Sequence, residues 1–231
     1  MADARTQLVA DGYDIIGEAF AEWRERGAGD PRRAWEDKLV ARLTDGTRML
    51  ELGCGGGSPE TKRLAQRFAV TGVDISPRQV ERARAAVPGA EFICADFTAL
   101  ELPEASFDAV ASFYVFNHVP RELLAPLLRD IHRWLVADAG STAGKAGGAR
   151  RSSRPPKAAG GGWLLAAFGQ TDLPGWTGEW LGAPTFFSSF PPEINSRLVR
   201  EAGFSIEEDE VVAWEGADDT PECFQWVLAQ A

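Results

Sequence analysis

The residues best able to do chemistry begin where a short apolar run meets a cluster of glycines. Residues 49–58 read Met-Leu-Glu-Leu-Gly-Cys-Gly-Gly-Gly-Ser. Glycine allows a sharp turn and lets a ligand approach backbone amides with no Cβ in the way. A strand that runs into such a loop and then a helix leaves two interpretations open: a dinucleotide fingerprint, whose third glycine is Ser58 here, and an ordinary tight turn.

Two acids lie in register with this loop. Asp74 ends the second predicted strand, nineteen residues after Gly55, where a carboxylate of an α/β sheet meets a ribose diol. Asp96 follows the third predicted strand and precedes Phe97, so it could accept a hydrogen bond from an adenine amine while the ring packs nearby. For each acid alone the alternative is a solvated strand end.

The chain has two histidines, His118 and His132. His118 follows the apolar run 107–115, and an imidazole with an ordinary pKa near ~6.5 suits proton abstraction. His118 is therefore a candidate general base, and a packing or hydrogen-bonding residue beside the ligand is the other interpretation. His132 lies on the predicted helix 120–136, next to its apolar stripe, and is expected to be a partly exposed helix residue.

The elements that position these residues follow from hydrophobic periodicity. Helical spacing over 8–44 is interrupted near 27–31, where Asp30 is a candidate N-cap and Pro31 a first helical residue. Strands alternating with helices then predict a parallel sheet that is covered on both faces. The expected strands are 49–52, 69–74, 91–94, 107–115 and 163–168, and the expected helices are 59–68, 77–87 and 120–136. After a loop at 169–192 and a helix at 192–202, strands 205–214 and 223–229 predict an antiparallel hairpin.

Aromatic residues are concentrated in the expected loop 169–192. This loop should overhang the carboxyl ends of the strands, where open α/β sheets bind ligands. An apolar lid over a planar or apolar substrate is one interpretation, and a packed loop that covers its own strand is the other. The candidate substrate residues are Trp176, Trp180, Phe186 and Phe187, with Phe190 beside them.

Composition restricts the partners and the compartment. The 231 residues carry a net charge of −10, which argues against a nucleic-acid backbone as the main partner. The three cysteines (Cys54, Cys94 and Cys223) show no CxxC spacing, no apolar run reaches about 18 residues, and the N-terminus shows no signal-peptide pattern. We expect a cytoplasmic protein with no membrane span and no metal site.

One segment does not follow the alternating pattern. Residues 138–162 contain seven glycines, six alanines, no aromatic residue and no aliphatic residue larger than alanine. Such a composition cannot bury enough apolar surface to offset its ordering entropy, which predicts a disordered insertion. Its five basic residues against one acid leave open a basic tether in place of a tolerated surface insertion.

Together these motifs resemble the class I S-adenosylmethionine (SAM) dependent methyltransferases. The resemblance rests on Glu51-x-Gly53-x-Gly55, Asp74, Asp96, the segment 112–119 and the closing hairpin, and it covers roughly 10–137 and 163–231. It implies a Rossmann-like three-layer α/β sandwich with a mostly parallel seven-stranded sheet. The expected organisation is a single methyltransferase domain, 1–231, with an N-terminal helical cap at 1–45 and the Rossmann-like core at 46–231.

The resemblance also implies site roles. Gly53 and Gly55 would line the methionine end of SAM, Asp74 would hold the ribose, and His118 would lie beside the sulfonium and the incoming nucleophile. Tyr13 would close over the cofactor. The full set implied to bind the cofactor is Tyr13, Glu51, Gly53, Cys54, Gly55, Asp74, Ile75, Asp96, Phe97, Phe113 and His118.

The expected activity is methyl transfer from SAM to an oxygen, nitrogen or carbon of a small, apolar or aromatic metabolite, by a monomer or a homodimer. Nucleic-acid methylation is disfavoured because the chain has neither an Asn/Asp-Pro-Pro-Tyr/Phe segment nor a Pro-Cys nucleophile. Two rivals remain: a SAM-binding protein without transfer activity, and a nicotinamide-dependent oxidoreductase. Ser58 and the lack of a second catalytic domain argue against the oxidoreductase.

Overall fold

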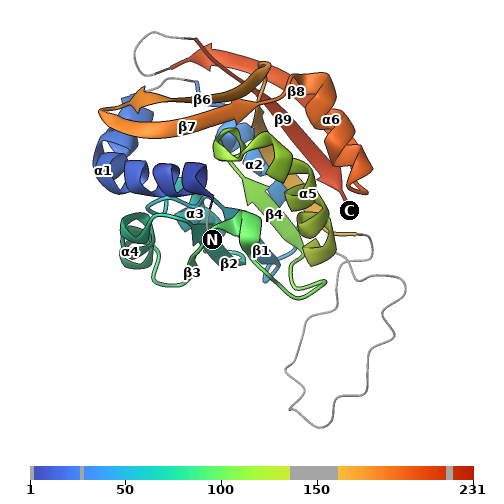
Figure 1. Cartoon of the computed structure of the whole chain (residues 1–231). Helices are drawn as coiled ribbons and strands as arrows, with labels where there is room; N and C mark the ends of the chain where they lie inside the picture. The colour runs from blue at the N-terminus through green and yellow to red at the C-terminus, as the bar shows by residue number, and fades with distance from the viewer. Residues whose placement is uncertain (1–2, 27–28, 136–160, 217–220) are drawn as a thin grey trace.

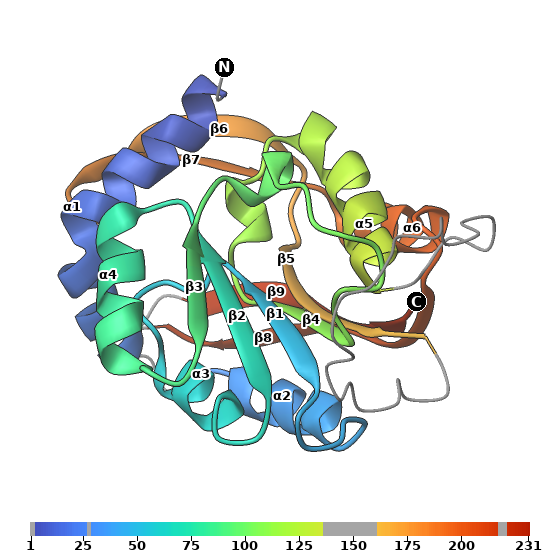
Figure 2. The ribbon, with the colours of Figure 1, turned by 90° about the horizontal axis from the view of Figure 1, so that it is seen from below.

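A seven-stranded sheet forms the centre of the protein in the computed structural model, which describes residues 3–26, 29–135, 161–216 and 221–231 (Figures 1 and 2). The strand order is β3-β2-β1-β4-β5-β9-β8, and β6 and β7 form a separate two-stranded sheet. The strands are β1 (Arg48–Leu52), β2 (Ala69–Asp74), β3 (Glu91–Cys94), β4 (Ala109–Ser112), β5 (Trp163–Gly169), β6 (Leu173–Trp180), β7 (Ala183–Ser189), β8 (Ser205–Glu215) and β9 (Pro221–Gln230). The helices are α1 (Ala4–Arg26), α2 (Arg32–Val40), α3 (Pro59–Leu64), α4 (Pro77–Ala86), α5 (Arg121–Leu135) and α6 (Pro192–Glu201).

The direction of the strands confirms the predicted fold class. Strands β1 to β5 pair in parallel, whereas β9 runs antiparallel between β5 and β8. From β1 the chain first adds β2 and β3 on one side and then returns to add β4 and β5 on the other. The carboxyl ends of β1 and β4 therefore diverge into a crevice, which is where open α/β sheets bind ligands.

Two apolar layers hold the sheet in place. The inner strands are buried on both faces, with Leu50 and Leu52 facing one layer and Met49 the other. On α5 the spacing of Leu124, Leu128 and Ile131 builds one apolar stripe against the first layer. Serine N-caps begin the two helices that follow β1 and β2, and each is followed by proline in the first turn. The caps fix where the loops after β1 and β2 end.

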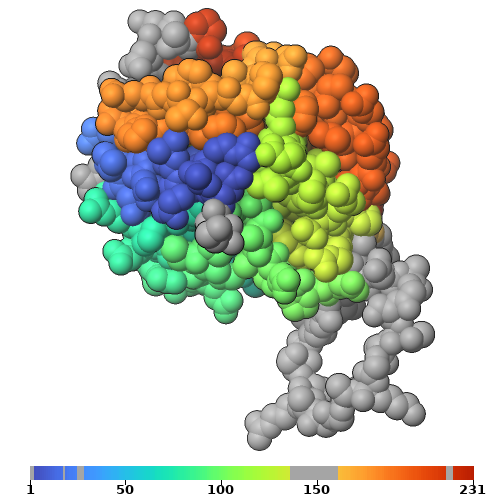
Figure 3. Space-filling model, viewed as in Figure 1, coloured from blue at the N-terminus to red at the C-terminus, as the bar shows by residue number. Residues whose placement is uncertain are grey.

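The N-terminal helix α1 crosses the carboxyl edge of the sheet and fits between β7 and α4. A Cβ on Gly12 would lie 2.6 Å from the Pro184 carbonyl oxygen, and one on Gly17 would lie 2.8 Å from Arg82 Nη1. Glycine at these two positions permits the close approach. Figure 3 shows α1, in blue, filling the space between the β6 and β7 strands and the green segments below.

Two predictions about the elements were wrong. The expected loop 169–192 contains β6 and β7, an antiparallel hairpin that turns at Leu181 (φ 50°) and Gly182 (φ 84°). Two consecutive residues with positive φ give a turn whose twist matches that of paired strands. The expected strand 107–115 is shortened to β4 because Tyr114 takes a left-handed conformation (φ 61°) and turns the chain away from the sheet.

The start of α2 differs slightly from expectation. Pro31 occupies the N-cap position, one residue before the helix, and Asp30 supports the first turn by accepting a hydrogen bond from the Arg32 backbone N–H at 2.8 Å. Residues 138–160 of the expected insertion lie outside the described residues. Gly162 belongs to the folded body, because it is buried against Leu135 and its carbonyl accepts from the Ala231 N–H at 2.8 Å. Among the described residues no helix is long and apolar enough to span a membrane.

Candidate active site

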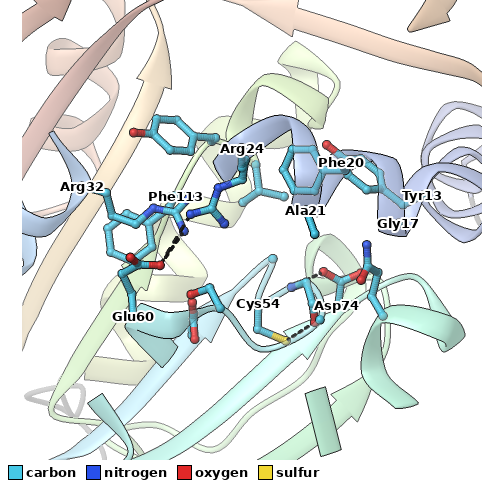
Figure 4. Close-up of a pocket in the computed structure, with 18 of the residues that line it drawn as sticks. Tyr13, Gly17, Phe20, Ala21, Arg24, Arg32, Cys54, Glu60, Asp74 and Phe113 are labelled. Atoms are coloured by element: carbon cyan, nitrogen blue, oxygen red, sulfur yellow. Dashed lines mark hydrogen bonds and ion pairs between the residues drawn. The ribbon is translucent and has the colours of Figure 1, made fainter. Parts of the chain in front are cut away.

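A cavity of about 750 Å³ lies between α1, the β6–β7 hairpin and the carboxyl ends of β1, β2 and β4 (Figure 4). The volume is in the range of pockets that hold a cofactor and a small substrate. It brings together ten of the residues named from the sequence as cofactor-binding, together with two of the aromatic residues. These are Tyr13, Glu51, Gly53, Cys54, Gly55, Asp74, Ile75, Phe97, Phe113, His118, Trp180 and Phe187.

The glycine loop forms the floor of the cavity. Gly53 and Gly55 both have positive φ, 71° and 54°. A Cβ on Gly53 would lie 2.7 Å from Val115, whereas one on Gly55 would meet no atom within 4 Å because it would point into open space. Gly53 is therefore required by packing, and Gly55 by its conformation and by the room it leaves for a ligand.

Asp74 lies at the end of β2 and is held by backbone amides. Its carboxylate accepts hydrogen bonds from Gly55 N–H at 2.8 Å and Ser76 N–H at 2.9 Å. Burial raises the pKa of Asp74, and the amide donors partly offset the rise. The carboxylate is thus fixed at the cavity wall before any ligand arrives.

Glu51 is a buried acid whose hydrogen bonding is incomplete among the described residues. Its Oε1 accepts from the Thr61 hydroxyl at 3.1 Å, whereas Oε2 has no partner there. Burial raises the pKa of Glu51 to about 7. A buried carboxylate with one free oxygen that lines a cavity is suited to receive a cationic group.

Two arginines line the cavity beside Glu51, and sequence reasoning did not identify them. Arg24 and Arg32 both approach Glu60 Oε2, from 3.5 and 3.8 Å, as Figure 4 shows. The Arg32 guanidinium also lies 4.8 Å from the ring centres of Phe113 and Tyr114. The one available signal was the helical spacing that places Arg24 about three turns after Tyr13 on α1. Two guanidiniums that share one carboxylate can accept a further anionic group.

His118 is fixed from two sides. Its Nε2 lies 3.0 Å from the Tyr13 hydroxyl, and its Nδ1 lies 2.8 Å from the Phe186 carbonyl oxygen. The Phe187 ring packs 4.5 Å from the imidazole, centre to centre. Burial lowers the pKa of His118 to about 4, so the ring is neutral at pH 7. This histidine connects α1 to the β6–β7 hairpin.

Four of the residues named from the sequence do not line the cavity, and one of them is Phe190, which packs against Arg121. Asp96 caps the short turn that follows β3, and its carboxylate accepts from the Thr98 N–H at 2.9 Å and the Thr98 hydroxyl at 2.7 Å. Phe186 points away and is buried under Arg5, although its carbonyl reaches His118. Trp176 is 43% exposed and contacts the outer side of Phe187.

The cysteines and His132 add no further catalytic group to the site. Cys54 is buried in the glycine loop, and burial raises the pKa of its thiol, so it is not a ready nucleophile. The three cysteines are free, and the residues that the structure describes contain no group of three or more metal-ligating side chains. His132 is half-buried on α5 and packs edge-on against Phe204, so the expectation of a helix residue is confirmed.

Comparisons with known proteins agree with this geometry. Residues 49–138 match the family model described as a methyltransferase domain. The chain is 32% identical over 133 residues to 27-O-demethylrifamycin SV methyltransferase of Amycolatopsis mediterranei, covering 48% of this chain and 49% of that protein. It is 43% identical over 149 residues to 2-methyl-6-phytyl-1,4-hydroquinone methyltransferase of Synechocystis, covering 49% of this chain and 46% of that protein. The chain thus spans about half the length of these curated relatives.

Solved structures share the fold at low sequence identity. Magnesium protoporphyrin IX methyltransferase from Synechocystis, with bound SAM, superposes with a TM-score of 0.63 at 18% identity over 99% of this chain and 98% of that one. The [4+2]-cyclase SpnF superposes with a TM-score of 0.66 at 19% identity over 100% of this chain and 98% of that one. The fold, the matched domain and the motifs agree with the class I SAM-dependent methyltransferases that the sequence resembles.

Proposed function

We propose that this protein transfers a methyl group from SAM to a nucleophilic atom of a small, apolar or aromatic molecule. The observation that carries the proposal is one continuous cavity. The glycine loop, Glu51 and Asp74 line it together with His118 and an aromatic wall. A donor and an acceptor held together in one cavity are prealigned for reaction, which can supply on the order of 7–11 kcal/mol.

The residues present fit SAM. The free Oε2 of buried Glu51 suits the ammonium group of the methionine end. Arg24 and Arg32, whose Nε atoms have no partner among the described residues, suit its carboxylate. Asp74 suits the ribose diol, and Ile75 and Phe97 lie on the cavity wall where the adenine would pack. The expected adenine contact of Asp96 stays a prediction.

When bound, SAM supplies an activated methyl group on a positively charged sulfur that leaves as a neutral thioether. The chain's own residues orient and enclose the reactants. Tyr13 and Phe20 from α1, together with Trp180 and Phe187 from the hairpin, form an aromatic cluster whose neighbouring ring centres lie 5.4 to 6.2 Å apart. This cluster presents an apolar surface beside His118, which would disfavour water there. The curated relatives support a small acceptor, since the rifamycin and hydroquinone enzymes are named for small molecules.

The most direct experiment is turnover of methyl-labelled SAM with a metabolite extract, followed by mass identification of the labelled product. Transfer of label to a small molecule supports the proposal, and the absence of label from every small molecule would contradict it.

Calorimetry distinguishes the methyltransferase from the two rival functions, a SAM-binding protein without transfer activity and an oxidoreductase. SAM binding without any turnover favours a non-transferring protein, an outcome that the fold similarity to a cyclase makes worth testing. Binding of NADH in place of SAM would favour an oxidoreductase.

We further propose a single domain over 1–231, with the cap at 1–45 and the core at 46–231, that works in the cytoplasm as a monomer or homodimer without nucleic acid. The free cysteines of the described chain are consistent with a reducing compartment. The net charge of −10 disfavours a nucleic-acid partner. Fractionation of cells tests the compartment, and light scattering of the purified protein tests the oligomeric state.

A further inference from the structure

We propose that Tyr13, with His118 behind it, removes the proton from a hydroxyl group of the acceptor. This inference rests on the proposed methyl transfer and deepens it, because it names the nucleophile as an oxygen that still carries its hydrogen. The two side chains come from distant parts of the sequence, and Tyr13 Oη and His118 Nε2 lie 3.0 Å apart in the wall of the cavity.

The hydrogen-bond network fixes which atom carries which proton. A carbonyl oxygen can only accept, so His118 Nδ1 carries the hydrogen and donates it to the Phe186 carbonyl at 2.8 Å. In a neutral imidazole the other nitrogen is then an acceptor. The Tyr13 hydroxyl therefore donates to Nε2, and its oxygen keeps lone pairs for a donor in the cavity. An acceptor hydroxyl is such a donor.

The surroundings keep both groups neutral until the reaction. The ring contacts of His118 are Tyr13 of α1 and Phe187 of β7, and no ion pair to it is found among the described residues. Burial raises the pKa of Tyr13, with a further contribution from Asp74 and a smaller opposing one from Arg24. Tyr13 thus transmits a proton and does not store a charge, while His118 receives it.

The step balances in atoms and charge. The acceptor oxygen forms a bond to the methyl carbon while the carbon–sulfur bond breaks. The hydroxyl proton passes to Tyr13 Oη, and the Tyr13 proton passes to His118 Nε2. The positive charge lost at sulfur appears on the imidazolium, so the buried cavity keeps the same net charge. This compensation helps a histidine with a low resting pKa to accept the proton, since charge changes are costly in a buried site.

The nature of the acceptor follows from this arrangement. An aryl thiol ionises readily near neutral pH and needs little help, whereas a phenol, with a pKa of about 10, stays protonated. The relay therefore matters for hydroxyl acceptors in particular. The aromatic wall and the relay together indicate a phenol or a similar aryl alcohol.

Two matched variants test the relay. Tyr13→Phe keeps the ring and removes the hydroxyl. His118→Asn keeps an N–H for the Phe186 carbonyl and removes the Nε2 acceptor. Ile15→Ala is the control, because Ile15 lies on the same helix with 65% of its surface exposed. The probes are 2-naphthol and 2-naphthalenethiol, with SAM binding measured in parallel by calorimetry.

For 2-naphthol we expect both variants to lower kcat about 100-fold at pH 7, the usual scale for general-base catalysis. For the thiol we expect less than about a threefold loss. The deficit with 2-naphthol should shrink toward pH 10, where the probe ionises by itself. An equal loss on both probes, or no loss on either, would overturn the relay, as would wild-type protein that binds SAM but methylates neither probe. Failure to bind SAM would instead overturn the proposed function.

A spectroscopic measurement on the protein alone provides a readout that needs no turnover. In ¹⁵N spectra His118 should be neutral at pH 7 with hydrogen on Nδ1, and Tyr13→Phe should shift the Nε2 resonance. His118→Asn leaves His132 as the single histidine, which assigns the signals. Hydrogen on Nε2, or an imidazolium at pH 7, would contradict the proposed direction of proton transfer.

Discussion

At the scale of single residues, the site contains buried ionisable groups whose charged form is disfavoured by the loss of water contacts. Glu51 is the clearest case, because burial raises its pKa to about 7 and one of its oxygens has no partner among the described residues. A ligand ammonium beside Glu51 would favour the ionised form and lower that pKa again. Binding of SAM and loss of a proton from Glu51 should therefore be linked.

We predict that SAM binding at pH 6 releases close to one proton and that its affinity rises up to about tenfold per pH unit between pH 5.5 and 7. At pH values below its pKa of about 7, Glu51 is mostly protonated and must lose its proton before it can pair with the ammonium group. The affinity for SAM therefore rises as the pH rises. Calorimetry in buffers of different ionisation enthalpy measures the proton. Glu51→Gln should abolish the release, and an unchanged release in that variant would assign the proton to another group.

Asp74 should make a direct contribution to cofactor affinity. We predict that Asp74→Ala weakens SAM binding by ~1.5–3 kcal/mol, the range for hydrogen bonds to a charged group. The backbone N–H of Gly55 would also lose its acceptor. Asp45→Ala, whose side chain is 77% exposed, is a charge-matched control that should bind SAM normally. Equal affinities of wild type and Asp74→Ala would remove Asp74 from the cofactor site.

Some of these residues could be predicted from sequence and others could not. Glu51, Gly53, Gly55 and Asp74 are fixed by local geometry, a strand followed by a tight turn or a strand end, so their spacing is informative. Arg24 and Arg32 act from two separate helices, and their convergence on Glu60 depends on how those helices pack. No short-range pattern records that packing.

At the scale of elements, the β6–β7 hairpin is the feature that sequence reasoning missed. Its turn contains Leu181 and Gly182 in place of the Asn-Gly or Asp-Gly pair that would indicate a hairpin. Its outer residues are exposed, so the apolar alternation typical of a half-buried strand is weak. The aromatic content predicted an apolar lid over a substrate, which stays a prediction; Trp180 and Phe187 line the cavity.

The turn of this hairpin provides a test of its role. Gly182 has φ 84°, where a Cβ costs about 1–2 kcal/mol. We predict that Gly182→Ala makes the β6 and β7 amides exchange hydrogen about tenfold faster, and that 2-naphthol turnover falls because the Phe186 carbonyl positions His118. Gly89→Ala is the control, since its φ is ordinary and a Cβ there meets no atom within 4 Å. Equal exchange in the two variants would refute the importance of the turn.

At the scale of the whole molecule, the alternation of strands and helices was sufficient to predict the sheet, because a parallel sheet needs crossover helices and these leave a clear periodic pattern. The position of the site also follows from the topology, since the order of addition reverses between β1 and β4. The sequence could not predict how α1 and the β6–β7 hairpin pack against each other at the carboxyl edge of the sheet. Gly12 and Pro184 approach closely there although they lie far apart in the chain.

The insertion supplies a final prediction about the whole molecule. Replacing 138–160 by a short Gly-Ser linker should leave SAM affinity within about twofold and change the melting temperature by less than about 2 °C, because the segment has no large apolar side chain to bury. Removing Gly161 and Gly162 as well should cost more. Gly162 packs on Leu135, and its carbonyl accepts the Ala231 N–H at the end of the chain. Calorimetry measures the melting temperatures of the two deletion variants. A large fall in melting temperature for the shorter deletion would mean that residues 138–160 contribute to the stability of the folded body.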